Sequence, residues 1–301
     1  MRVLLTGGSG FVGDAIAGRL LREGCHVVAL GRRPLRYSAN SAVEFCPADL
    51  GHSLISEQIS GLLPLDAVVH AAARISFASS DSEVSRVNCA GTHQLVEAAI
   101  KSGIPRFVYM SSISVTGSPS GLVITEAAPL EPRSAYAASK AYGEFLVAHG
   151  YGSHGVYSTL RVTAPVGSGI PAGRLPAALV RNATAGRPLL IYGQGNRRQN
   201  YVDIRDVAQA VWLALHSTRS GLFNIGGSCS ISNSELAETV IRELHSESSI
   251  VYSETKDPED GQSWTVSIDE AKRLLGYAPL YDISASIRAM AADCDRNPAS
   301  G

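Results

Sequence analysis

Two side chains able to move a proton lie four residues apart in SAYAASKAYGEF (residues 134–145), namely Tyr136 and Lys140. In a helix, this spacing places both side chains on one face. A free phenol has a pKa of about 10, but a nearby ammonium favours the phenolate and lowers that pKa. The pair therefore predicts a general acid/base that exchanges a proton with a carbinol oxygen. The alternative is that both are surface residues of an alanine-rich helix.

A second hydroxyl group is expected at the end of the apolar run in FVYMSSISVTG (107–117). Ser111 and Ser112 stand where a strand would reach the carboxyl edge of a parallel sheet, the edge at which open α/β proteins bind ligands. A serine there would hydrogen-bond the same substrate oxygen as Tyr136. An ordinary strand end is the alternative reading.

The stretch TGGSGFVG (6–13) follows an apolar strand and opens a helix, with Gly7, Gly10 and Gly13 around Phe11 and Val12. Glycine lets the backbone approach a pyrophosphate, and the free N–H groups at a helix N-terminus hold the anion. The strand and helix context predicts a dinucleotide site here rather than a merely tight turn. Lys140 would then also hold the ribose hydroxyls of the cofactor.

The residues at the tip of the second strand favour NADP(H), with NAD(H) as the alternative. NAD sites usually carry an acidic residue about 20 positions after the glycine loop, where it binds the ribose 2′-hydroxyl. This chain has Gly31 there, followed by Arg32 and Arg33. Two guanidinium groups match a 2′-phosphate. A solvated turn would leave NAD admissible.

Short apolar runs alternate with helix-length segments through the first half of the chain, which predicts a doubly wound α/β fold on a parallel sheet. The helices after the first strand and near 88–102 are expected to end at Gly24 and Gly103. Glycine- and proline-rich loops follow residue 165, and GLFNIGG (221–227) is expected to return a strand to the sheet. We predict a nucleotide-binding domain over 1–166 and 200–228, and a smaller α/β substrate lobe over 167–199 and 229–301.

Composition excludes several classes of function. The 301 residues include 26 basic and 27 acidic ones, so the chain lacks the charge excess that nucleic acid or an anionic membrane requires. The five cysteines are scattered without zinc spacing, and His70 is expected to be packed or hydrogen-bonded, so we predict no metal site. The glycine-interrupted N-terminus is not a signal peptide, which predicts a cytoplasmic protein.

Taken together, the motifs resemble those of the extended short-chain dehydrogenase/reductases, the nucleotide-sugar epimerase/dehydratase group. The resemblance runs almost end to end and rests on the order and spacing of these motifs: TGGSGFVG, ADL (48–50), VVHAAA (68–73), VNCAGT (87–92), MSSISVTG, YAASK, LRVTAPVG (160–167), NYVDIRDVA (200–208) and LLGYAP (274–279).

The resemblance implies a Rossmann domain whose C-terminal lobe closes over a nucleotide-linked sugar, and it implies roles for individual residues. Ser112, rather than Ser111, would be the catalytic hydroxyl. The cofactor would be contacted by the following residues: Asp49 and Leu50 near the adenine, Ala71, Ala72 and Ala73 along the ribose phosphates, Asn88 below the active site, and Pro165 and Val166 beside the nicotinamide. A homodimer through the helices near 88–102 and 136–149 is also implied.

Two departures from the family pattern bear on the reaction. The two acids that follow the catalytic hydroxyl in hexose dehydratases are replaced here by Ile113 and Ser114, which argues against dehydration. The arginine that often grips the substrate diphosphate is replaced by Gln199. Arg198 stands one residue earlier, although strand alternation would point it to the other face.

We therefore expect an NADP(H)-dependent reductase that delivers hydride to a keto group of a nucleotide-linked deoxysugar, with Tyr136 as the proton donor. The first alternative is an NAD(P)-dependent nucleotide-sugar epimerase that retains its cofactor. The second is a non-catalytic NAD(P)-binding regulator. A small, sterol-like or flavonoid-like ketone is an alternative substrate.

Overall fold

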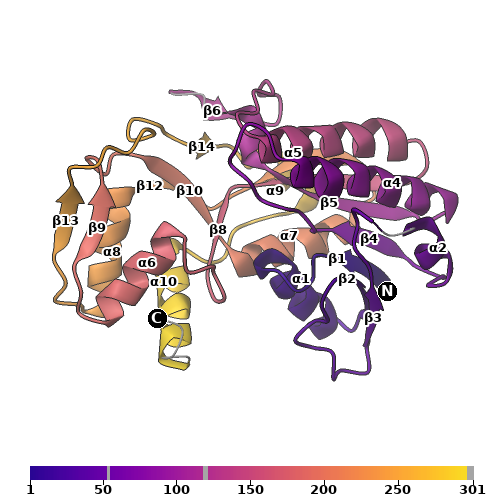
Figure 1. Ribbon diagram of the computed structural model, residues 1–301, viewed down its shortest axis with the longest axis horizontal. Helices are drawn as coiled ribbons and strands as arrows, with labels where there is room; N and C mark the ends of the chain where they lie inside the picture. The colour runs from indigo at the N-terminus through magenta and orange to yellow at the C-terminus, as the bar shows by residue number, and fades with distance from the viewer. Residues whose placement is uncertain (53–54, 118–120, 297–301) are drawn as a thin grey trace.

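The computed structural model describes residues 1–52, 55–117 and 121–296 of the chain. A large parallel sheet with helices on both faces forms one part, and a smaller group of helices and strands lies beside it (Figure 1). This arrangement confirms the doubly wound α/β fold that the alternating apolar runs predict.

The central sheet has seven strands, all parallel, in the order β11-β7-β5-β4-β1-β2-β3. The strands are β1 (Arg2–Thr6), β2 (His26–Gly31), β3 (Val43–Pro47), β4 (Ala67–His70), β5 (Arg106–Ser112), β7 (Val156–Val162) and β11 (Gly221–Ile225). Their inner strands are apolar runs because both faces of a doubly wound sheet are covered. The segment GLFNIGG supplies β11, the edge strand that the sequence predicts.

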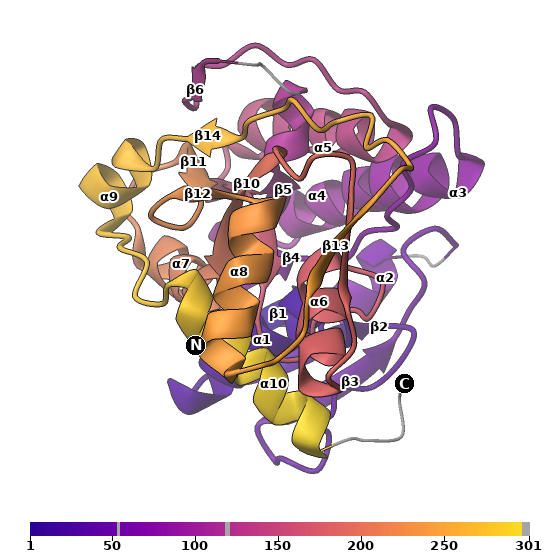
Figure 2. The ribbon, with the colours of Figure 1, turned by 90° about the vertical axis from the view of Figure 1, so that its left-hand side faces the viewer.

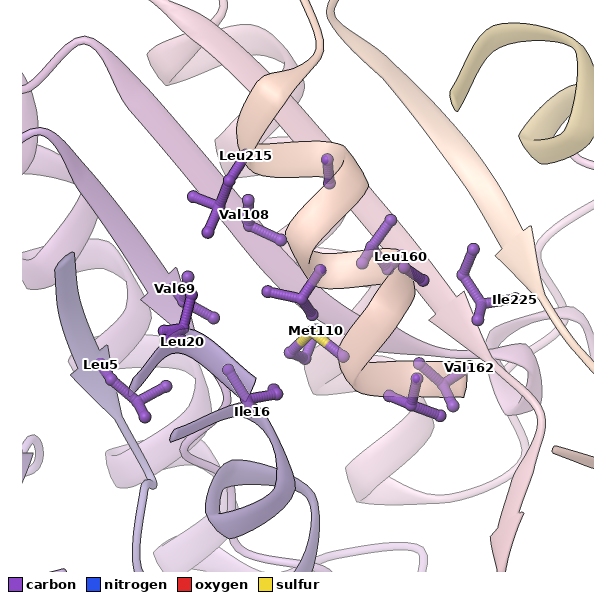
Figure 3. Packing of buried hydrophobic residues seen from close by; sticks show 14 of the residues in the cluster. Leu5, Ile16, Leu20, Val69, Val108, Met110, Leu160, Val162, Leu215 and Ile225 are labelled. Carbon is purple, nitrogen blue, oxygen red and sulfur yellow. The ribbon is translucent and has the colours of Figure 1, made fainter. Parts of the chain in front are cut away.

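Helices cover the two faces of the sheet and enclose two hydrophobic cores. They are α1 (Phe11–Arg22) and α7 (Ile204–His216) on one face, and α2 (Ile55–Ser60), α4 (Gly91–Lys101) and α5 (Ala135–Phe145) on the other (Figure 1). Figure 3 shows Ile16 and Leu20 of α1 packing against the sheet beside Leu5 and Val69. Gly24 and Gly103 follow the ends of α1 and α4 with φ of 75° and 61°, as expected for glycine C-caps.

The smaller lobe has a core of its own. It contains two short sheets and the helices that face the viewer in Figure 2. Its elements are β8 (Ala164–Val166), α6 (Leu175–Thr184), β9 (Leu189–Tyr192), β10 (Arg198–Asp203), β12 (Ser230–Ser232), α8 (Asn233–Leu244), β13 (Ile250–Ser253) and α10 (Ile283–Arg296). A capping box of Ser232 and Glu235 begins α8.

Shorter elements connect these parts. They are the helical turns α3 (Ser82–Val84) and η2 (Ile113–Thr116), the π-helices η1 (Ser85–Ala90) and η3 (Leu146–Tyr151), the paired strands β6 (Val123–Ile124) and β14 (Thr265–Val266), and the helix α9 (Asp269–Leu275). β8 pairs with β10, and α9 contacts β11 and α7, so segments on the two sides of the predicted boundaries contact each other. The division at residues 166, 199 and 228 stays a prediction.

Two buried carboxylates join α7 to the C-terminal part of the lobe. Asp203 accepts hydrogen bonds from Arg205 (2.8 Å) and from the hydroxyl of Ser286 on α10 (2.6 Å). Asp206 accepts the backbone N–H groups of Leu280 and Tyr281. Each oxygen that burial removes from water is thus hydrogen-bonded. Within the described ranges, none of the helices has the length and apolar character needed to cross a membrane.

Candidate active site

The glycine loop is packed so closely against neighbouring backbone that two of its residues have no room for a Cβ atom. Gly7 has a φ of 71°, and a Cβ there would lie 2.5 Å from the amide nitrogen of Ala72. A Cβ at Gly13 would lie 2.1 Å from the carbonyl oxygen of Gly7. Helix α1 starts directly after Gly10, and among the described residues no side chain caps it. Its first N–H groups therefore fit a dinucleotide pyrophosphate.

The segment after β2 presents two exposed arginines. Gly31 is the last residue of β2, beside Pro47 of β3. Arg32 and Arg33 follow on the surface and form no ion pair with any residue that the structure describes. Arg33 borders a groove of about 1490 Å³ that begins at Ser9, Gly10 and Phe11 and continues between α1 and helices α6 and α10. Arg33 thus shares a groove with the glycine loop, and the contact of both arginines with a cofactor stays a prediction.

The other predicted cofactor residues occupy the same edge of the sheet. Asp49 lies 3.6 Å from Arg86 and accepts the N–H of Gly51, while Leu50 is buried in the second core. Residues 71–73 follow β4, and the N–H of Ala72 donates to the hydroxyl of Thr6. Their contacts with adenine and ribose remain predictions.

The three predicted catalytic residues meet at this edge. Ser112 is the last residue of β5, and Tyr136 lies in the first turn of α5, whose N-cap Ser134 accepts the N–H of Ala137. One turn later, the Nζ atom of Lys140 lies 5.8 Å from the centre of the Tyr136 ring. Ser112 lies near the phenol and lowers its pKa, while its hydroxyl is hydrogen-bonded to that of Ser114 at 2.9 Å. The sheet edge and the helix spacing therefore bring together the groups that the sequence singles out.

The protonation of Tyr136 differs from the sequence-based expectation. Burial raises the pKa of the phenol to about 12, and the groups that oppose this are the hydroxyl of Ser112 and the charge of Arg174. Lys140 is not among them. Its Nζ atom donates to the carbonyl of Met110 (2.7 Å), which turns the ammonium toward β5. The phenol is therefore a proton donor in the absence of further positive charge.

Lys140 lies in an apolar, electron-rich environment. Its Nζ atom is 4.9 Å from the centre of the Tyr109 ring, and the residue is 3% exposed. Burial lowers the pKa of Lys140 to about 7, whereas the charge of Glu144 raises it. The charge state of this lysine is thus sensitive to its neighbours near neutral pH.

Asn88 connects the loop after β4 to the catalytic helix. Its amide nitrogen donates to the carbonyl of Arg74 and to the hydroxyl of Ser139 on α5, both at 2.9 Å, and its oxygen accepts the N–H of Arg74. The residue lies in η1, and π-helical turns are frequent at functional sites. The structure thus places Asn88 beneath α5.

A buried ion pair lies behind the predicted catalytic residues and was not predicted from the sequence. Arg161 of β7 binds Glu144 of α5 through two hydrogen bonds of 2.9 and 2.8 Å, and Ser111 donates to the same carboxylate at 2.6 Å. Ser111 is therefore committed to Glu144, which leaves Ser112 as the hydroxyl at the site. The sequence signal for this ion pair is Arg161, a charged residue within STLRV (158–162).

The predicted substrate residues on β10 point to opposite faces. Arg198 pairs with Glu235 (3.0 Å) and donates to the carbonyl of Ser230. With its amide oxygen toward the neighbouring guanidinium, Gln199 accepts from Arg197 at 2.8 and 2.9 Å. Arg197, rather than Arg198, thus shares a face with Gln199. Pro165 and Val166 lie on the adjacent strand β8.

His70 is a structural residue, as expected. Its two ring nitrogens contact the hydroxyls of Thr6 (2.7 Å) and Thr92 (2.9 Å). Burial, and secondarily the charge of Lys140, lowers the pKa of His70 from 6.5 to about 3. The part of the chain that the structure describes contains no group of three or more His, Cys, Asp or Glu residues able to hold a metal ion.

The depressed pKa of His70 predicts acid sensitivity. The unfolded chain protonates His70 near pH 6.5 and the folded one only near pH 3, so stability is lost as the pH falls between these values. We expect the free energy of unfolding to fall by about 2 kcal/mol between pH 7 and pH 5 through this residue. Urea unfolding of the wild type and of His70→Asn at both pH values measures it. An equal pH dependence in both proteins would contradict the assignment.

Comparison with known proteins agrees with this geometry. The sequence pattern of the family described as "NAD dependent epimerase/dehydratase family" matches residues 3–226. The chain belongs to this family. The resemblance drawn from the motifs is thereby confirmed, as is the expectation of an enzyme of the extended short-chain dehydrogenase/reductase type. NADP(H) specificity and the reductase reaction are not confirmed.

Individual family members match the chain over almost its whole length. A dTDP-glucose 4,6-dehydratase from Streptomyces niveus is 31% identical, covering 93% of this chain and 88% of its own. A UDP-glucose 4-epimerase from Thermus thermophilus, solved with NAD, is 26% identical, with a TM-score of 0.84 over 97% of this chain and 98% of its own. A Thermotoga maritima UDP-glucose 4-epimerase, 21% identical, has the same fold, with a TM-score of 0.91 over 99% and 100% of the chains.

Proposed function

We propose that the protein is a nucleotide-sugar epimerase that oxidises one carbinol carbon of its substrate and reduces it again on the other face, with NAD as the retained cofactor. The observation that carries the proposal is the meeting of Ser112, Tyr136 and Lys140 at the sheet edge that also bears the glycine loop. The relatives named as UDP-glucose 4-epimerases support this reaction and a nucleotide-linked sugar as the substrate.

The side chains divide the proton chemistry among them. Bound by the glycine loop and Lys140, NAD would supply the hydride acceptor and donor for the carbinol carbon. Tyr136, as phenolate, accepts the carbinol proton while the ketone forms, and as phenol it gives the proton back to the alkoxide. Because burial raises the pKa of Tyr136 to about 12, the phenolate needs positive charge beside it. Ser112 hydrogen-bonds the substrate oxygen, and Lys140 holds the ribose.

The residues after Ser112 argue against dehydration. Elimination of water from a sugar needs an acid and a base beside the neighbouring carbons. Ile113 is buried, and Ser114 is hydrogen-bonded to Ser112 at 2.9 Å. Neither side chain carries a carboxylate, so we propose that the ketone is reduced again without loss of water.

A second candidate is an NADP(H)-dependent reductase of a nucleotide-linked keto-sugar, favoured by Gly31, Arg32 and Arg33. With no acidic residue at the strand tip and two guanidiniums without an ion pair in the described part of the chain, a 2′-phosphate meets attraction there. The two candidates differ in whether the cofactor is consumed.

One experiment separates the two candidates. Denaturing a sample of the purified protein releases any retained nucleotide for identification. The native protein is incubated with UDP-glucose and dTDP-glucose while NMR follows the sugar configuration. Retained NAD and a new epimer without added cofactor support the epimerase. Stoichiometric oxidation of added NADPH by a nucleotide-linked keto-sugar supports the reductase. If neither change occurs, the proposed function is wrong.

The arginine pair predicts a cofactor preference that mutation can measure. In Arg32→Gln/Arg33→Gln, the dissociation constant for NADPH is expected to rise about tenfold, since a charge-assisted hydrogen bond to phosphate is lost. The constant for NADH is expected to stay within about twofold. Fluorescence titration of reduced nicotinamide measures both, with the exposed and distant Arg219→Gln as the control. An unchanged NADPH constant contradicts a role for the pair.

We also propose a cytoplasmic homodimer that binds neither nucleic acid nor membrane. Tyr142 and Phe145 of α5 support a partner on that helix because they are 38% and 59% exposed. The near-neutral charge balance supports the absence of a polyanionic partner.

A further inference from the structure

The site depends on how α5 is held against the sheet, because its parts come from two elements. Ser112 ends strand β5, whereas Tyr136 and Lys140 lie on α5. Helix α5 is fixed to β5 and β7 by Glu144, whose carboxylate receives Ser111 and both arms of the Arg161 fork. Ser111 and Arg161 are directly opposed in the β5–β7 register. The contact therefore fixes the helix at the level of the catalytic serine.

Glu144 is also the nearest carboxylate along the helix to Lys140. The spacing of four residues places the two side chains on one face, with Cβ atoms about 5–6 Å apart. Both residues are buried, Lys140 to 3% and Glu144 to 6% exposure. In such surroundings a charge acts on its neighbour with little screening from water. Arg161 donates two hydrogen bonds to this carboxylate, and among the described residues Glu144 forms no direct hydrogen bond to Lys140.

The other groups around Lys140 do not replace this charge. His70 faces it from β4 and Tyr109 from β5, Tyr136 lies on its own helix, and Cys89 of η1 lies near Tyr109. All four are neutral near pH 7, because the pKa of His70 is lowered while burial raises those of Tyr109, Tyr136 and Cys89. Glu144 is the carboxylate that acts on Lys140 among the residues described.

We propose that Glu144 is a positioning residue that favours the charged form of the buried Lys140 amine and holds α5 in register with Ser112. The proposal rests on the proposed function in its use of Lys140. It is nevertheless tested by a measurement that needs no substrate. With Glu144 in place, the amine of Lys140 is charged in about half of the molecules at pH 7. Without that charge, burial removes the proton from Lys140 at lower pH.

The test reads the titration of Lys140 directly. The chain has four lysines, so protein labelled with ¹⁵N and ¹³C in lysine gives four side-chain signals. Lys101, Lys256 and Lys272 are exposed and serve as internal references. In Glu144→Gln/Arg161→Met the ion pair is removed as a whole, an exchange that buried pairs often tolerate. If the variant with methionine does not fold, Glu144→Gln/Arg161→Gln is used instead to measure the titration midpoint of Lys140.

We expect the Lys140 midpoint, about 7 in the wild type, to fall by about one pH unit or more in these variants. Ser111→Ala, which keeps the carboxylate and its charge, should leave the midpoint within about 0.3 units. Lower thermal stability with an unchanged midpoint would overturn the proposal, since it would mean that Glu144 only holds the helix. Activity provides a separate reading: the alkaline limb of the pH–rate profile should move downward with the midpoint. An inactive wild type with the expected NMR shift would refute the proposed function and leave the role of Glu144 intact.

Discussion

Replacing Tyr136 by phenylalanine is expected to lower kcat by a factor of about 10²–10⁴, the usual contribution of a positioned general acid/base. The phenyl ring keeps the packing, but no proton can be passed to or from the substrate oxygen. Cofactor and substrate affinity should change little, because Lys140 and the glycine loop remain. Steady-state turnover of the nucleotide-linked sugar, with calorimetric titration of NAD, separates the two effects.

Tyr142→Phe is the matched control for that substitution. Tyr142 lies on the same helix, and its hydroxyl contacts His93 at 3.3 Å on the surface. We expect its activity to equal that of the wild type. If Tyr136→Phe also retains full activity, hydride transfer by this site is refuted. If the wild type binds NAD but converts no substrate, a cofactor-binding regulator becomes the better description.

Substituting Gly13 by alanine is expected to weaken NAD binding about 10- to 100-fold. The new methyl group would lie 2.1 Å from the carbonyl oxygen of Gly7, which is backbone and cannot rotate away. Overpacking of this kind costs about 1–3 kcal/mol, and each 1.4 kcal/mol in binding is a factor of about ten. The loop must shift, so the N–H groups that face the pyrophosphate lose their positions. Calorimetric titration of NAD measures the loss.

Gly261→Ala provides the control for Gly13→Ala. A methyl group at Gly261 would have no described atom within 4 Å, and the residue has no positive φ, so alanine fits there. The NAD affinity and melting temperature of this variant should match those of the wild type. An unchanged affinity in Gly13→Ala would mean that the loop does not bind the pyrophosphate.

The sequence was sufficient to predict most of the central sheet because local signals and tertiary structure agree there, although β7 was not among the predicted strands. Each apolar run in the first half became a strand of that sheet, and glycine followed both helices where it was expected. The lobe was harder to predict because its strands are short and pair across distant segments, as β9 does with β13. Strands β6 and β14 pair Val123 and Ile124 with Thr265 and Val266, and no local sequence pattern predicts this pairing.

The active site was predictable to the extent that it rests on spacing. Four residues in a helix placed Lys140 beside Tyr136, and the strand end placed Ser112 near both. The direction of the ammonium was not predictable, because it depends on the carbonyl of Met110 from another element. The sequence-based expectation that Lys140 lowers the pKa of the phenol was therefore wrong. Burial has the largest effect on the pKa of Tyr136, and it raises that pKa.

Side chains on the lobe show a similar limit. Strand alternation correctly separates Arg198 from Gln199, but Glu235 and Arg197, their respective partners, come from contacts that a sequence pattern does not contain. The substrate roles of both residues therefore stay predictions. A charged residue such as Arg161 within a strand is a sequence signal for a buried ion pair, since an ionised group in a core requires a partner.

The connection between β7 and β8 directly links the central sheet to the smaller lobe. Only Thr163 separates Val162, the end of a central strand, from Ala164, the start of the lobe's sheet. If a bound sugar draws the lobe inward, the backbone at Pro165, which is predicted to lie beside the nicotinamide, would move with it. Binding of the sugar and binding of the dinucleotide are then coupled. If the sugar raises the affinity for the dinucleotide by some factor, the dinucleotide raises the affinity for the sugar by the same factor.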